Sequence, residues 1–402
     1  MRSLLRSTAK TIALIPALIM LIGLRLIRPL VEVRLMVVGF HKFGHLALEP
    51  ELALLEIETE LASRGKKFPR IVTWWSFGPR KLRANPYLVD KWKEVLRAKP
   101  SWWLDALIRV GRQAPFLSLP VPTLSIQRPM QQLSKTAPRL QFSSEEISTA
   151  KKELAELGID ASKPFVCLVV RDDGHYGDVL TSENPNFLSA NFDVDQFVLA
   201  SKELVAMGYQ VVRMGAGKEK PMLSRSPGIF DYAKSTVRSP FLDVYLAANC
   251  AFTVSTQTGP DAVSLLFRRP VCFIDIPIFS QFFFGTSLAF WNPCSLRKEG
   301  TMISLQEIVT TDKVWAKYAH VLREQGIDGV RLTSEEIAET VKDFAMLFSH
   351  DFALSTEDAT LCTRANEMIT AGMGQLGKEN FGEIQARISP SYLRRNAHWF
   401  LQ

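Results

Sequence analysis

The short motifs that identify several large enzyme classes are missing from this 402-residue sequence. It has no His-Glu-x-x-His pair for a metalloprotease zinc site, no Gly-x-Ser-x-Gly turn and no Walker A phosphate loop. Its five cysteines form no Cys-x-x-Cys pair, so neither a zinc site nor a disulfide framework is indicated. These absences disfavour metal-dependent hydrolysis and serine-hydrolase chemistry.

The net charge of +7 is concentrated near the amino terminus. Residues 1–34 contain six basic residues and one acidic residue, a net charge of +5, which leaves +2 for the rest of the chain. A nucleic-acid-binding protein needs a basic stripe on its folded domain, with aromatic residues interleaved. The distribution of charge therefore argues against nucleic acid as a partner.

A mostly apolar run, TIALIPALIMLIGL, lies between Lys10 and Arg25. It is shorter than the roughly 20 residues of a bilayer span, and the cleavage site of a signal peptide is missing. We expect residues 1–30 to form an uncleaved anchor on the membrane surface, aided by anionic lipids. A short true span and a buried core helix are the alternatives. Scattered, unpaired cysteines are typical of a reducing compartment, so we expect the cytoplasmic face of the inner membrane.

Strands and helices alternate in two series, which predicts an α/β fold with parallel sheets. A proline-rich segment, 115–139, separates the series and is typical of an inter-domain connection. Ser143 and Glu146 form a capping box that opens a helix ending near Gly158. We predict strands at 31–40, 70–75, 165–170, 209–213, 251–255 and 271–275, helices at 86–99, 194–206, 240–248 and 260–267, a helix from Pro50 to Gly65, and a helical carboxyl terminus.

Charged and hydroxyl residues follow two of the predicted strands, where α/β folds bind their ligands. Arg171 follows the strand at 165–170, and its planar guanidinium can donate to two phosphate oxygens. Asp172, His175 and Tyr176 come next and could position it or bind sugar hydroxyls. An ion pair between Arg171 and Asp172 or Asp178 that only pins the loop is the alternative.

The second such segment is STQTGPDA, residues 255–262, which runs from a strand into a helix. Free N–H groups at a helix start favour an anion, although capping by Asp261 could explain the same residues. A third strand-end loop, RMGAGKEK at 213–220, is basic but weak evidence by itself. The candidate anion-binding residues are Ser255, Thr256, Thr258 and Gly259.

The loop GFHKFGHL, residues 39–46, follows the first predicted strand and has glycine near both ends. Glycine allows the backbone to approach a ligand closely. His41, His45 and Glu49 place titratable groups there, and histidine near pH 7 can take a proton from a hydroxyl nucleophile. These three residues are the candidate bases, with a structural role as the alternative.

Several blocks of the sequence resemble bacterial glycosyltransferases of polysaccharide and surface-glycan gene clusters, from about Gly39 to the carboxyl terminus. The blocks include VRDDGHYGD, FDYAKS, the stretch from FLDVYLAANC to VCFID, and ISPSYLRRNAHWFL. These enzymes are distantly similar to GT-B transferases, including heptosyltransferases and fucosyltransferases that use a nucleotide sugar.

The resemblance implies two Rossmann-like domains facing a cleft, with an N-terminal hydrophobic helix and a helical C-terminal tail. It implies an acceptor-side domain at 31–140, a nucleotide-sugar domain at 141–350, and helices at 351–402 that pack back on the first domain. Arg171 and the Ser255–Gly259 turn would hold the donor pyrophosphate, and Met214–Gly215 would pass close to the nucleotide. No metal or cofactor is expected, because cationic groups and helix ends can neutralise the leaving diphosphate.

The implied partners are a nucleotide-sugar donor, a glycan or lipid-linked acceptor, and the membrane surface. The implied reaction is transfer of a sugar to an acceptor hydroxyl. A nucleotide-sugar epimerase on the same fold, or a non-catalytic scaffold of glycan assembly, are the alternatives.

Overall fold

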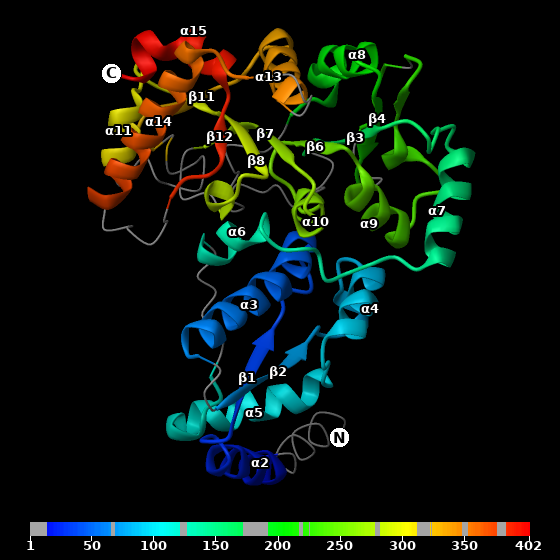
Figure 1. Ribbon diagram of the computed structural model, residues 1–402, viewed down its shortest axis with the longest axis vertical. Helices are drawn as coiled ribbons and strands as arrows, with labels where there is room; N and C mark the ends of the chain where they lie inside the picture. Colours follow the sequence, from blue (N-terminus) through cyan, green and yellow to red (C-terminus); the bar gives the residue numbers. More distant parts are fainter. Residues whose placement is uncertain are drawn as a thin grey trace. The chain divides into compact units, whose positions relative to one another are not determined.

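The computed structural model describes residues 14–65, 69–120, 127–171, 192–216, 220–224, 226–277, 282–311, 322, 324–347, 353–375 and 383–402. The chain forms two compact units, Met1–Ser125 and Ile126–Gln402, here called unit 1 and unit 2. Each unit combines parallel strands with helices, so the predicted α/β class is confirmed (Figure 1).

Unit 1 is built around two parallel strands, whose register pairs Val31 with Arg70 and Val37 with Ser76. Short backbone pairings extend both edges, because Leu35 N–H donates to Pro120 and Lys99 N–H donates to Trp75. Its elements are α2 (Leu14–Leu26), β1 (Val31–Val37), α3 (Phe43–Ser63), β2 (Arg70–Ser76), η1 (Arg80–Leu82), α4 (Pro86–Val95), α5 (Ser101–Gln113) and η2 (Pro115–Leu117).

The amino-terminal apolar run forms α2, which packs against α5 near the start of β1 (Figure 1). Ala17 and Leu21 are buried there with Leu104 and Leu107 of α5. The opposite side of α2 is also apolar, yet it faces outward. The helix is therefore neither wholly buried nor detached from the unit. In the part of the chain that is described, no helix is long and apolar enough to cross a membrane.

Helix α3 begins at Phe43, so the predicted start at Pro50 was wrong. Pro50 lies inside the helix and has no N–H to donate to the carbonyl of Leu46, four residues earlier. The indole N–H of Trp92 in α4 donates to that carbonyl at 3.1 Å, and both residues are fully buried. A tertiary contact thus satisfies the acceptor that proline leaves open.

Unit 2 contains a seven-stranded parallel sheet of order β12-β8-β7-β6-β3-β4-β5. Its elements are α6 (Gln127–Leu133), α7 (Ser144–Glu156), β3 (Phe165–Val169), η5 (Val194–Phe197), α8 (Val198–Ala206), β4 (Gln210–Met214), β5 (Ile229–Phe230), η6 (Tyr232–Lys234), α9 (Pro240–Asn249), β6 (Phe252–Ser255), α10 (Asp261–Leu266), β7 (Val271–Ile276), η7 (Phe282–Gly285), β8 (Ala289–Pro293), β9 (Ser295–Lys298), β10 (Thr301–Met302), α11 (Leu305–Thr310), β11 (Ile327–Val330), α13 (Ser334–Leu347), α14 (Thr356–Gln375), β12 (Arg387–Ile388) and α15 (Pro390–Phe400).

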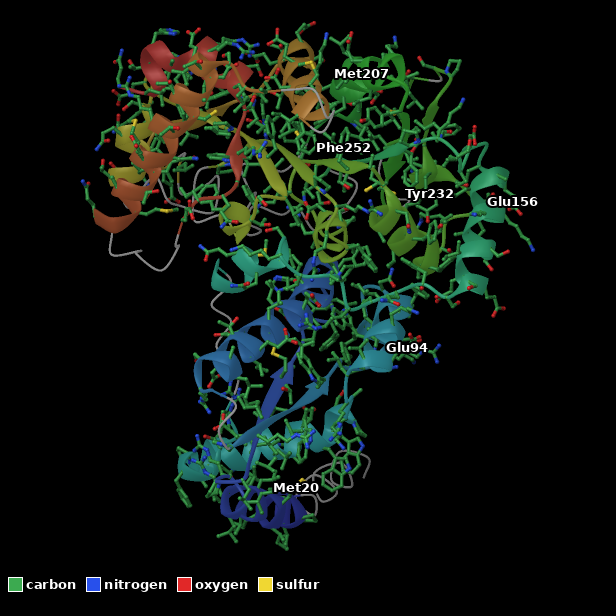
Figure 2. All side chains as sticks on the ribbon, in the orientation of Figure 1. Met20, Glu94, Glu156, Met207, Tyr232 and Phe252 are labelled. Atoms are coloured by element: carbon green, nitrogen blue, oxygen red, sulfur yellow. The ribbon has the colours of Figure 1, made fainter. Side chains whose placement is uncertain are left out.

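Helices cover both faces of this sheet, and alternate residues of each strand point to opposite faces. Val166 and Leu168 of β3 pack with residues of α8 and α13. Phe165, Cys167 and Val169 of the same strand pack on the other face with residues of α7 and α9. Figure 2 shows the contrast between Phe252 inside the unit and Glu156 at the outer surface of α7. Burial on both faces explains why the strands have continuous apolar sequences.

The sequence predicted the central strands well and missed the outer ones. The capping box is confirmed, since Ser143 accepts from the Glu146 N–H and the Glu146 carboxylate accepts from the Ser143 N–H. Helices α14 and α15 pack on each other, and α14 packs on α11. Two-residue strands such as β12 and β5 carry too few residues for a periodic pattern, so no such signal was available.

We expect Trp92→Phe to lower the free energy of unfolding by about 1–3 kcal/mol, because it leaves the buried Leu46 carbonyl without a donor and opens a small cavity. In a Pro50→Ala background the restored N–H can bond to Leu46 within the helix. Trp92→Phe should then cost about 1 kcal/mol less. Urea unfolding followed by circular dichroism measures this difference, and equal costs in the two backgrounds would refute the compensation.

Candidate donor site and candidate base

The order of strands reverses beside β3 in unit 2. From β3 the chain continues to β4 and β5 on one side, and then returns to β6, β7 and β8 on the other. The register aligns Val169 of β3 with Met214 of β4 and with Ser255 of β6. Since all three strands are parallel, the residues that follow them lie along one edge. Ligands of open α/β sheets bind at this kind of switch point, outside the carboxyl ends of the strands.

The structure brings together two of the predicted donor-binding segments at the switch point. The backbone N–H of Arg171 donates to Thr256 Oγ1 at 3.0 Å, and the N–H of Thr256 donates to the carbonyl of Val169 at 3.1 Å. These bonds join the loop after β3 to the turn after β6. They hold Arg171 at the start of its loop, beside the hydroxyl-rich turn of residues 255–259.

The turn from Ser255 to Asp261 is organised around the carboxylate of Asp261. Its Oδ2 accepts from the Ser255 hydroxyl at 2.7 Å and from the Thr258 N–H at 2.6 Å. The Gln257 N–H donates to Ser255 Oγ at 3.0 Å, and Gln257 has a positive φ of 63°. Asp261 therefore already accepts two of the donors that the sequence offered for a phosphate, and α10 itself has only six residues.

The Asp261 carboxyl is fully buried, and this burial raises its pKa to about 6. The hydrogen bonds from Ser255 and Thr258 and the charge of Arg171 oppose the shift. Arg171 is thus close enough to Asp261 for its charge to act on that carboxyl. The edge of the sheet contains a buried carboxyl and a cation that stabilises its ionised form.

The third predicted segment follows β4 at the same edge. Met214 is buried at the end of the strand, and partly exposed Gly215 comes next. Arg213 is not a loop cation, because it is fully buried and pairs with Asp231 at 3.0 Å. Arg213 therefore contributes no positive charge to this loop, which was predicted to be basic. Asp172 and Tyr176, also predicted to bind the donor, lie outside the described residues.

A second arginine, Arg331, lies near this edge and was not predicted from the sequence. The carbonyl of Arg171 accepts from the Phe192 N–H at 2.9 Å, and the Arg331 guanidinium lies 4.3 Å from the centre of the Phe192 ring. Arg331 also donates to Asp275 Oδ2 at 2.9 Å, at the end of β7. Asp275 is fully buried with a positive φ of 57°, and burial raises its pKa. The position of Asp275 at the end of an apolar strand could have indicated this residue from the sequence. No such feature of the sequence indicated Arg331.

An Asp-x-Asp triplet, Asp193–Val194–Asp195, directly follows Phe192, and both of its carboxylates have structural roles. Asp193 caps η5 by accepting from the Asp195 N–H, and Asp195 accepts from the Leu223 N–H. Among the residues that the structure describes, no group of three His, Cys, Asp or Glu side chains could hold a metal ion.

In unit 1 the candidate bases surround the carboxyl end of β1. His45 and Glu49 lie one turn apart on α3, with Nδ1 of His45 2.7 Å from Oε1 of Glu49. The other oxygen of Glu49 accepts from the Gly39 N–H at 2.7 Å. The third candidate, His41, is exposed and packs its ring edge-on against Phe40. The structure thus pairs two of the three candidates.

Gly39 is required for this arrangement. A Cβ at position 39 would lie 2.7 Å from the Cβ of His45 and 3.4 Å from Oε1 of Glu49. The first of these distances is shorter than a non-bonded contact, so any larger residue would displace His45 from Glu49. The glycine predicted to admit a ligand in fact admits the histidine itself.

Comparisons with known proteins found similar solved structures only. No protein-family model matches the chain, and no curated protein matches it. One similar solved structure is E. coli ADP-heptose LPS heptosyltransferase II, with a TM-score of 0.38 and 14% identity, covering 60% of this chain and 84% of that chain. Another is a family 9 glycosyl transferase from Veillonella parvula, with a TM-score of 0.35 and 10% identity, covering 61% and 80%. Both scores are low, so we infer function from the residues of this chain.

Asp261→Asn tests the buried carboxyl, because the amide keeps a hydrogen-bond acceptor and removes the charge. A pKa raised from its ordinary 3.8 to about 6 means that ionisation in the folded state costs stability. That cost is absent below about pH 4 and complete above about pH 6. We expect the wild type to lose up to about 3 kcal/mol relative to Asp261→Asn between these limits. Urea unfolding of both proteins across this range is the measurement, and parallel stability curves would contradict it.

Proposed function

We propose that this protein is a GT-B-like glycosyltransferase that binds a nucleotide-sugar donor at the carboxyl edge of the unit 2 sheet. The observation that carries the proposal is the hydrogen bond between Arg171 N–H and Thr256 Oγ1 at the switch point. It holds a guanidinium-bearing loop beside a hydroxyl-rich turn, in the place where α/β sheets bind nucleotides. The sequence resemblance to surface-glycan glycosyltransferases points to the same edge.

Arg171 would stabilise the diphosphate that leaves when the sugar is transferred. Charge builds up on the departing phosphate oxygens, and a preorganised guanidinium neutralises it without a metal ion. Ser255, Thr256, Thr258 and Gly259 would shape the remainder of the phosphate site, and Met214–Gly215 would border the nucleotide. Asp172 and Tyr176 remain predicted donor contacts.

The pair His45–Glu49 would supply the base in unit 1. Glu49 bonds to Nδ1 of His45, which favours the tautomer with its proton on Nδ1 and leaves Nε2 free to accept. Nε2 would take the proton of an acceptor hydroxyl as its oxygen bonds to the anomeric carbon. The bond from that carbon to the phosphate oxygen breaks, and the diphosphate leaves with the electron pair. The acceptor would be a glycan or a lipid-linked glycan.

The exposed side of α2 would attach the protein to the cytoplasmic face of the inner membrane. Ile15 and Ile19 are 67% and 65% exposed, and Leu18, Ile22 and Leu26 continue the same stripe. An apolar stripe of this kind lies favourably in the interface of a bilayer. Deletion of the amino terminus would also remove Ala17 and Leu21 from the core, so point substitutions in the stripe test the attachment more cleanly.

The donor site predicts selective stabilisation by one nucleoside diphosphate. We expect the melting temperature to rise with one of UDP, GDP, ADP or CDP, and this rise to disappear in Arg171→Ala. Loss of one preorganised donor should lower the rate of transfer by about 10²–10³. Lys152→Ala, at an exposed position on α7, is the matched control. No shift with any nucleotide would instead favour a non-catalytic scaffold.

The base assignment predicts a difference between His45 on α3 and His41 in the loop before that helix. His45→Ala should lower kcat by about 10²–10⁴, since general base catalysis is worth that much. Glu49→Gln should lower it less, and His41→Ala should leave it nearly unchanged. Turnover and its pH profile with a nucleotide-sugar donor are the measurements. Equal activity of His45→Ala and His41→Ala would place the base elsewhere.

A further inference from the structure

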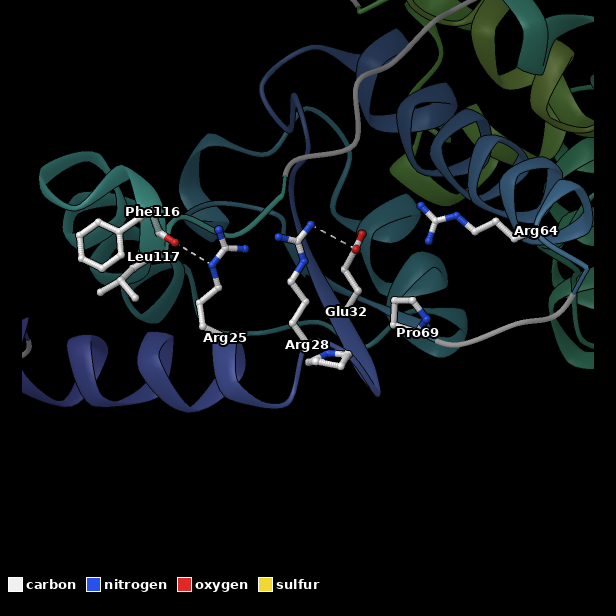
Figure 3. Close-up of a pocket in the computed structure, with 8 residues that line it drawn as sticks. Arg25, Arg28, Glu32, Arg64, Pro69, Phe116 and Leu117 are labelled. Atoms are coloured by element: carbon white, nitrogen blue, oxygen red, sulfur yellow. Dashed lines mark hydrogen bonds and ion pairs between the residues drawn. The ribbon is translucent and has the colours of Figure 1, made fainter.

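A cavity of about 660 Å³ lies in unit 1 beside the carboxyl end of α2 (Figure 3). Arg25 and Arg28 reach it from the end of α2 and the turn after it, and Arg64 from the end of α3. Glu32 of β1 and Phe116 of η2 contribute to the same wall. Three cations therefore converge on one hollow from three segments of the unit.

The two carboxylates nearby, Glu32 and Glu60, each pair with two arginines. Arg34 makes two hydrogen bonds to Glu60, at 2.6 and 2.8 Å, and one to Glu32 at 2.8 Å. The bonds from Arg34 hold the pKa of Glu60 below its usual value. Arg28 reaches Glu32 at 3.5 Å, and Arg64 also contacts Glu60. The network thus has four arginines, including Arg25, for two carboxylates.

The surplus positive charge lies on accessible side chains. Arg28 and Arg64 are 45% and 37% exposed. Arg25 donates through Nε to the carbonyl of Phe116 at 2.7 Å, and no carboxylate pairs with it among the described residues. A guanidinium has five N–H donors, so each of these three arginines can donate to an oxyanion as well as to its present partner.

Exposed apolar side chains adjoin the cavity and decide which anion fits it. Phe116 lines the cavity and is exposed, and Leu26, Ile27 and Leu30, which are close in sequence to Arg25 and Arg28, are exposed as well. The apolar stripe of α2 ends at the same place. A soluble phosphate would leave these side chains in water, whereas a lipid presents a phosphate and acyl chains together.

We propose that this cavity binds the phosphate of an anionic membrane phospholipid, which orients unit 1 with α2 in the interface. The proposal rests on the membrane attachment proposed for α2 and adds a specific headgroup site to it. The three arginines contact the phosphate, while Ile15, Ile19 and Leu26 enter the acyl region beside it. Binding then depends on two separate features, an apolar stripe and a cationic site.

Vesicle flotation of the full chain separates these features. We expect stronger binding to phosphatidylcholine vesicles that contain phosphatidylglycerol than to phosphatidylcholine alone. Arg28→Gln and Arg64→Gln should each lower binding to the anionic vesicles by about fivefold and leave binding to neutral vesicles unchanged. Ile19→Asp should lower binding to both kinds by about tenfold or more. Lys152→Gln removes one exposed charge from unit 2 and should change neither.

Several results would overturn the headgroup site. Equal losses in Lys152→Gln and Arg28→Gln would show that only net charge matters. Equal binding of the wild type to both vesicle types would leave the attachment of α2 standing and remove the cavity from it. Stabilisation by inorganic phosphate alone, with no preference for anionic vesicles, would identify a soluble anion instead. A dimer that Ile19→Asp dissociates, without vesicle binding, would assign the stripe to a second copy of the chain.

Discussion

The parallel pairing of β3 with β4 and β6 is the constraint on which the proposed donor site depends. It places Val169, Met214 and Ser255 at one level, so the segments that follow these strands begin side by side. The chain visits β4 before it returns to β6, and this order of connections creates the switch point beside β3. Just beyond the paired strands, the hydrogen bond from the Arg171 N–H to the Thr256 hydroxyl joins the two segments that follow β3 and β6.

Buried charge at the carboxyl edge is balanced locally. Asp261 and Asp275 are both fully buried, and an isolated carboxylate in such a place would be costly. Arg331 pairs directly with Asp275, whereas Arg171 acts on Asp261 through its charge. Burial still dominates in both carboxyls, since each pKa is raised. The edge therefore combines cations with buried carboxyls that are easier to protonate than usual.

In unit 1, single polar contacts also decide the local structure. Trp92 supplies the donor that Pro50 lacks, and so a helix can begin early enough to include His45 and Glu49. Gly39 then leaves room for His45, and its N–H orients Glu49. Near the start of β1, Arg34 binds both acidic side chains, Glu32 and Glu60. That network leaves the cavity lined by Arg25, Arg28 and Arg64 with excess positive charge.

The amino-acid sequence by itself determined the features that depend on near neighbours in the chain. The capping box of Ser143 and Glu146 and the apolar strands at 165–169 and 271–276 need only a few consecutive residues, and all were predicted. The sequence of α2 is apolar on nearly every side, so it predicts an apolar helix but not which side of that helix is buried. Which of those sides packs on α5 is set by residues some 85 positions away, such as Leu104.

Only the tertiary structure decided the interactions that join distant segments. Pro50 reads as a helix start until Trp92 is placed against Leu46. Asp261 reads as a simple capping residue until burial is known, and Arg331 has no local signal because its partner Asp275 lies 56 residues away. Local patterns follow from steric and hydrogen-bonding preferences of neighbouring residues, which a sequence displays directly. Burial, pairing of buried charges and the choice of exposed face depend on what packs above each residue, and this is settled only when the chain has folded.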